Sequence, residues 1–122
     1  MKRILLCLIC IFSLLGSKAQ SYNELVEKAM DYTFKDSLQQ AEELFREALR
    51  LDPYNARNAL LFSNLGTVLK RQGKIDEAID SYTMALNITP YATAILLNRA
   101  TLYMEKNLTE KAYLDYCNVI DL

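Results

Sequence analysis

The hydrophobic pattern along residues 22–121 is that of amphipathic helices. Apolar residues recur at intervals of three, four and seven, which places them on one face of a helix. Only three glycines and two prolines occur in the whole chain, so few turns interrupt the pattern. We therefore expect an all-α fold with six helices, over residues 22–34, 38–51, 56–71, 75–88, 91–105 and 109–121.

The pattern occurs three times in succession, over residues 22–55, 59–92 and 93–122. In the middle copy the recurring residues are Phe62, Leu65, Gly66, Leu69, Ala78, Tyr82, Ala85 and Pro90. At the same spacings the first copy has Leu25, Ala29, Tyr32, Ala41, Phe45, Ala48 and Pro53, and the third has Leu96, Ala100, Tyr103, Ala112 and Tyr116. Each copy is one helix pair that cannot bury its apolar face alone, so about three must stack.

The turn inside each copy is predicted to need a residue with positive φ. Gly73 occupies this place in the middle copy, and glycine adopts that conformation at little cost. Asp36 and Asn107 occupy the equivalent places, and both residue types tolerate it better than most. The inserted residues 56–58 lie between the first two copies and are expected to lengthen the following helix by almost a turn.

The repeat resembles the tetratricopeptide repeat. The residues that carry the resemblance are Asn64-Leu65-Gly66, the stretch 72–79, Tyr82 and Pro90. Lys28 and Arg99 depart from the usual leucine of the family. The resemblance implies a right-handed solenoid of three antiparallel helix pairs, with a protein or peptide partner bound in a concave groove lined by the first helix of each pair. By repeat position, the groove residues are Val26, Met30, Phe34, Ser63, Asn64, Thr67, Lys70, Arg71, Leu97, Asn98, Thr101 and Glu105.

One subset of the family clamps the C-terminal carboxylates of cytosolic chaperones with lysine, asparagine and arginine side chains. Of those positions only Asn64 matches, because the others hold Val26, Met30, Ala94 and Asn98. We therefore expect no such carboxylate clamp.

Residues 1–19 have the pattern of a secretory signal peptide. Met1-Lys2-Arg3 is basic, residues 4–15 are apolar except for Ser13, and small residues follow, which favours cleavage after Ala19. A membrane span needs roughly 20 apolar residues, so this run is too short. A lipoprotein signal acylated at Cys10 is disfavoured because Ile9 is not small. The remaining domain, residues 20–122, is then expected in the periplasm or outside a bacterial cell, without a membrane span.

The composition argues against catalysis and against nucleic-acid binding. The chain has no histidine, which removes the commonest general base and metal ligand, so we expect no enzyme, metal site or cofactor. No basic stripe with interleaved aromatics suggests nucleic acid. The paired acids Glu42-Glu43 and Asp76-Glu77 are expected to be solvated at helix starts. Cys117 is expected to be a buried, inert thiol.

These observations predict an exported protein-interaction module that acts as a scaffold or adaptor in the cell envelope. The alternative is the N-terminal fragment of a longer envelope protein, whose activity lies in further repeats or in an effector domain. No polar capping helix follows the last pair, so self-association through that uncapped pair is a further expectation.

Overall fold

The computed structural model describes residues 21–120, and every regular element among them is a helix. Residues 21–34 are helical, followed by α2 (Leu38–Leu51), α3 (Asn58–Arg71), α4 (Ile75–Ile88), α5 (Thr93–Glu105) and α6 (Thr109–Ile120). The all-α fold and the six helices are thus confirmed, and the bounds differ from expectation by two residues or fewer. The predicted signal peptide, residues 1–19, lies outside the described residues.

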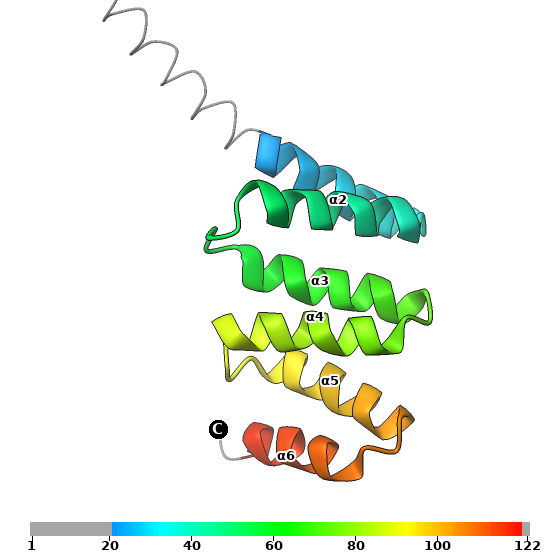
Figure 1. Ribbon diagram of the computed structural model, residues 1–122, viewed down its shortest axis with the longest axis vertical. Coiled ribbons are helices and arrows are strands. Elements are labelled where there is room, and N and C mark those ends of the chain that lie inside the picture. The colour runs from blue at the N-terminus through cyan, green and yellow to red at the C-terminus, as the bar shows by residue number, and fades with distance from the viewer. Residues whose placement is uncertain (1–20, 121–122) are drawn as a thin grey trace, which may run out of the picture.

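Consecutive helices lie side by side in chain order and form a single stack (Figure 1). α2 packs on α3, α3 on α4, α4 on α5 and α5 on α6. Because each helix contacts its sequence neighbours, the apolar faces of successive pairs form one continuous core. The right-handed coiling of the stack stays a prediction. Within residues 21–120, no helix is long and apolar enough to cross a membrane.

Small residues sit where the helices approach most closely, as the repeat pattern predicts. Ala29, Ala41, Ala78, Ala100 and Ala112 are completely buried. Gly66 allows a close approach of α3 and α4, because a Cβ atom at this position would lie 2.8 Å from the ring of Tyr82. Tyr82 is itself fully buried, so α3 and α4 can pack at this distance only with glycine here.

The three turns within the repeats have the predicted conformation. Asp36, Gly73 and Asn107 have φ values of 61°, 79° and 59°. Each turn is closed by an amide that donates to the carbonyl five residues earlier, from Ser37, Lys74 and Leu108 at 2.8, 2.9 and 2.8 Å. This is the hydrogen bond of a Schellman C-cap, which requires one left-handed residue.

The insertion at residues 56–58 adds only Asn58 to the next helix, so the expectation of almost a full turn is wrong. α3 begins at Asn58, while Ala56 and Arg57 form a turn. The Asn55 side-chain oxygen accepts a hydrogen bond from the Arg57 amide at 2.9 Å, which stabilises this turn against the helix. The Asn58 side chain is buried and donates to the Asp52 carbonyl at 2.8 Å. The insertion therefore forms a hydrogen-bonded connection between the first two repeats.

Candidate functional site

A hollow of about 390 Å³ lies between the N-terminal helical segment and α3. Its lining residues are Met30, Thr33, Phe34, Asn64, Thr67 and Arg71. Five of these six are predicted groove residues, and they come from the first helices of two consecutive repeats. Thr33 was missed, although its spacing from Met30 places it on the same helical face. We refer to this hollow as the inter-repeat pocket.

Met30 and Phe34 give the inter-repeat pocket an exposed apolar wall. The Met30 side chain is 47% exposed and that of Phe34 is 91% exposed. Asn64 lies across from them, and its side-chain amide donates to the Met30 sulfur at 3.3 Å. A thioether is a weak acceptor, so this amide is available to a better one.

The charged groups at this pocket are already paired. One Arg71 nitrogen donates to the Thr33 carbonyl at 3.4 Å, and another forms an ion pair with the Asp36 carboxylate. On the adjoining turn of helix, Lys35 donates to Asp31 at 2.8 Å. Arg71 and Lys35 therefore each have an acidic partner within the chain.

A part-buried hydroxyl pair lies at the pocket, between Thr67 of α3 and Tyr82 of α4. The Thr67 hydroxyl lies 2.8 Å from the Tyr82 hydroxyl, and it also donates to the Ser63 carbonyl at 3.2 Å. Burial raises the pKa of Tyr82, and the hydrogen bond with Thr67 offsets only part of that shift. The phenol therefore stays neutral and acts as a structural hydrogen-bonding group.

The other predicted groove residues do not line the pocket. Val26 is buried in the core at 5% exposure, so the expectation that it faces the groove is wrong. Val26 belongs to the hydrophobic core, so the apolar stripe of this helix is wider than the repeat position suggested. Ser63 and Lys70 are half-buried on α3, outside the pocket lining. Leu97, Asn98, Thr101 and Glu105 lie on α5, in the next repeat, and their role in binding stays a prediction.

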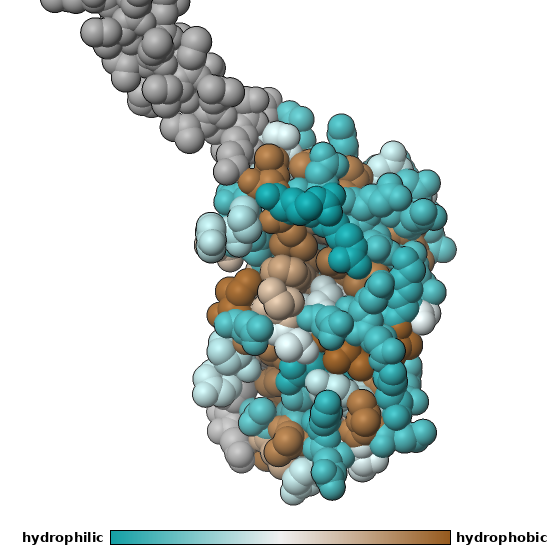
Figure 2. Space-filling view, viewed as in Figure 1, coloured by the Kyte–Doolittle hydropathy of each residue, from teal (hydrophilic) through white to brown (hydrophobic). Residues whose placement is uncertain are grey.

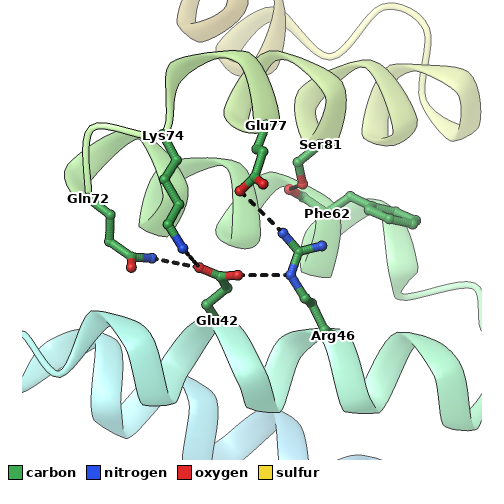
Figure 3. A network of polar contacts seen from close by, with 7 residues as sticks. All are labelled: Glu42, Arg46, Phe62, Gln72, Lys74, Glu77 and Ser81. Atoms are coloured by element: carbon green, nitrogen blue, oxygen red, sulfur yellow. Dashed lines mark hydrogen bonds and ion pairs between the residues drawn. The ribbon is translucent and has the colours of Figure 1, made fainter.

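A second polar feature is an ionic cluster between α2 and the turn before α4 (Figure 3). The Glu42 carboxylate accepts hydrogen bonds from Lys74 at 2.8 Å and from Arg46 and Gln72 at 3.0 Å. Burial alone would raise the pKa of the Glu42 carboxyl, but these hydrogen bonds outweigh it and lower the pKa. The Glu42 side chain is only 13% exposed, so the expectation of a solvated acid is wrong for this residue.

A buried ion pair joins α5 to α6. Arg99 donates to the two carboxylate oxygens of Asp115 at 2.8 and 2.7 Å, and also to the Thr83 hydroxyl at 3.1 Å. The side chains are 17% and 3% exposed. Arg99 therefore departs from the family's leucine because Asp115 supplies a buried counter-charge, which the repeat pattern alone does not indicate. Cys117 of α6 was expected to be buried, but the structure leaves it half-buried.

Several large apolar side chains are exposed on α6, and the space-filling view shows apolar residues among hydrophilic ones at this end of the molecule (Figure 2). Ile120 is 79% exposed, whereas Leu86, the equivalent residue of α4, is 6% exposed beneath α5. Tyr113 and Leu114 are also exposed. Self-association through this face of α6 stays a prediction. Among residues 21–120, no three His, Cys, Asp or Glu side chains are grouped as a metal site.

Comparison with known proteins identifies the repeat. A family model described as "Tetratricopeptide repeat" matches residues 18–90. The crystal structure of a tetratricopeptide repeat protein from Parabacteroides merdae matches this chain with a TM-score of 0.81 and a sequence identity of 48%. The match covers 83% of this chain and 40% of that chain. DnaJ homolog subfamily C member 7 from Homo sapiens is 40% identical over 77 residues, which is 62% of this chain and 16% of that protein.

The fold also matches a domain that was solved with a peptide. The second TPR of Spaghetti (RPAP3), bound to the HSP90 peptide SRMEEVD, has a TM-score of 0.75 and 17% identity, and the match covers 88% of this chain and 98% of that one. At a sequence identity of 17%, this match shows a similar fold only. Since the family model covers more than half of its residues, the chain belongs to the tetratricopeptide-repeat family of protein-interaction modules.

Proposed function

We propose that this module binds an extended segment of a partner protein along the groove formed by the first helices of its repeats, and that it catalyses no reaction. The observation that supports this function is the inter-repeat pocket, where predicted groove residues from two repeats converge on one hollow. Exposed Met30 and Phe34 supply contact area, and Asn64 supplies an amide for a peptide backbone.

The binding function is tested with a double substitution in the groove. Partners captured by the purified full chain are identified by mass spectrometry, purified, and titrated against the wild type and against Asn64→Ala with Asn98→Ala. We expect the double substitution to weaken binding of a direct partner. Tyr54→Ala is the control, because Tyr54 is 95% exposed in the turn between α2 and α3. Equal affinity for the double variant and the wild type would place the partner outside the groove.

We further propose that the protein is exported and serves as a scaffold or adaptor in a bacterial envelope. Support comes from the basic start and the short apolar run of residues 1–15, followed by small residues. Mass spectrometry of protein purified from its host is expected to give an N-terminus at Gln20, in the periplasmic or secreted fraction. Retention of residues 1–19 in the cytoplasmic fraction would contradict export.

The exposed face of α6 supports a second contact surface. We expect weak, concentration-dependent self-association through this face, because burying Ile120 and Tyr113 removes apolar surface from water. Sedimentation velocity of the full chain tests this against Ile120→Glu, which should remain monomeric. A wild type that stays monomeric at the highest concentrations would exclude self-association. The alternative of an envelope protein with further repeats or an effector domain stays a prediction.

A further inference from the structure

The inter-repeat pocket has the wrong charge pattern for an acidic ligand. Its only lining cation, Arg71, is bound by the Asp36 carboxylate and by the Thr33 carbonyl. The Asp36 carboxylate already compensates the positive charge of this guanidinium, so a ligand carboxylate would gain less from contacting it than from contacting an unpaired arginine. Lys35, on the neighbouring turn, is held in the same way by Asp31. The pocket therefore has little net attraction for a negatively charged side chain or chain end.

The apolar wall of the pocket is suited to one large side chain. Met30 and Phe34 are four residues apart, so they form one stripe on the helical segment. Phe34 is almost fully exposed although it is a large hydrophobic residue, and Met30 can adjust its shape to a neighbour. A cavity of about 150 Å³ already admits benzene, and this open hollow of about 390 Å³ exceeds that volume.

Asn64 supplies the polar contact that orients a bound chain. Its side-chain amide donates only to a thioether in the free protein, and exchange for a peptide carbonyl would give a stronger hydrogen bond. The Thr67 hydroxyl is engaged with Tyr82 and Ser63, so Asn64 is the better positioned of the two. An asparagine contact to backbone atoms works for an internal segment as well as for a chain end.

We propose that the inter-repeat pocket takes a large uncharged side chain, such as leucine, methionine or phenylalanine, from an internal extended segment of the partner, with its backbone bound to Asn64. This inference rests on the proposed groove-binding function and specifies the partner chemistry. It differs from recognition of an acidic C-terminus such as that of the peptide SRMEEVD, bound in the Spaghetti structure.

Two random peptide libraries test the inference on the purified full chain. In one, the random segment is internal and both ends are blocked; in the other, it ends in a free carboxylate. We expect the internal library to be enriched for a large uncharged apolar residue at one position, and the second library to show no preference for acidic C-termini. Enrichment of acidic residues or of free carboxylates would overturn the inference and leave groove binding intact. No enrichment in either library would refute groove binding itself.

Substitutions then locate the selected peptide. Phe34→Ala and Asn64→Ala are expected to weaken its binding about tenfold or more, as for central contacts of an interface. Tyr54→Ala is the matched control, because it removes an equally exposed aromatic ring far from the pocket, and binding should be unchanged. Full binding by Phe34→Ala would place the apolar side chain elsewhere and overturn the assignment. The peptide SRMEEVD, titrated in parallel, should bind no better than a scrambled peptide.

Discussion

Replacing Arg99 by leucine, the usual residue of the family at this position, is expected to destabilise the protein. In the structure Arg99 forms two hydrogen bonds with Asp115, at 2.8 and 2.7 Å, and a third with Thr83 at 3.1 Å. Asp115 is 3% exposed, so water cannot replace the lost guanidinium. The substitution would restore the family consensus and leave a buried carboxylate without its cation.

The size of the effect follows from two opposing contributions. Removing one partner of a buried ion pair costs about 3–5 kcal/mol, because the remaining charge is uncompensated. Arg99 is 17% exposed, which favours the lower end of that range. Burial of the apolar surface of the leucine side chain adds roughly 1 kcal/mol to the free energy of unfolding. The net loss is therefore about 2–3 kcal/mol, or roughly 10–20 °C in the melting temperature of a domain of this size.

Thermal and urea unfolding, followed by far-ultraviolet circular dichroism, measure this loss. The variant Arg99→Leu with Asp115→Leu should recover most of the stability, since an apolar pair in place of a buried ion pair is often neutral or better. Lys28→Leu is the matched control, because Lys28 occupies the same repeat position and is exposed. Its effect should lie within about 0.5 kcal/mol.

Two results would refute this reasoning. A higher melting temperature for Arg99→Leu than for the wild type would show that leucine at position 99 stabilises the fold more than arginine does. It would also show that the buried Asp115 carboxylate needs no cationic partner. A double variant no more stable than the single one would show that the lost stability does not come from the unpaired carboxylate.

Three further predictions concern packing and polar contacts. Gly66→Ala should gain about 1 kcal/mol from helix propensity and lose about 1–3 kcal/mol because its Cβ would overlap the buried Tyr82 ring, so the net loss of stability should be up to about 2 kcal/mol. Tyr22→Phe should cost about 1 kcal/mol in urea unfolding, because it removes the 2.9 Å hydrogen bond to Asn58. Glu42→Gln should cost about 1 kcal/mol at neutral pH, and this cost should disappear in acid because the folded state lowers the pKa of Glu42.

The sign of the pH effect follows from the direction of that shift. A carboxyl whose pKa is lower in the folded state stabilises the protein above its unfolded pKa of about 4.3, and the contribution is lost as the pH falls through the folded value. The urea midpoints of the wild type and of Glu42→Gln should thus converge at pH values below the folded-state pKa of Glu42. A constant difference at all pH values would contradict the assignment. For Tyr22→Phe, an unchanged midpoint would show that the hydroxyl bond contributes nothing. For Gly66→Ala, a variant about 1 kcal/mol more stable than the wild type would show that the contact with the ring costs nothing.

Much of the fold could be predicted because the governing interactions are local. Helix positions follow from the spacing of apolar residues within one segment, and the turn at Gly73 follows from the φ that the C-cap requires. Asp36 and Asn107 were placed in the same conformation by repeat alignment alone. The insertion at residues 56–58 was misjudged because apolar spacing does not show that side chains form the connection, from Asn55 to the Arg57 amide and from Asn58 to the Asp52 carbonyl.

The lining of the inter-repeat pocket was predicted in part for the same reason. Repeat position placed Met30, Phe34 and Asn64 together, and all three line this pocket, because the period of a helix fixes which residues share a face. It did not exclude Val26, since burial depends on how far the neighbouring helices overlap. It also could not show that Arg71 is paired with Asp36, because that contact joins residues of different repeats.

The sequence by itself therefore determined the helices, their repetition and the turns, all of which follow from the backbone period and from local steric preference. The tertiary structure alone decided which charged residues are buried and paired, such as Glu42 with Lys74 and Arg99 with Asp115. The free energy of a charge depends on its solvent exposure and on the distance to its partner. Both are properties of how the helices stack, and neither is encoded in the spacing along a single helix.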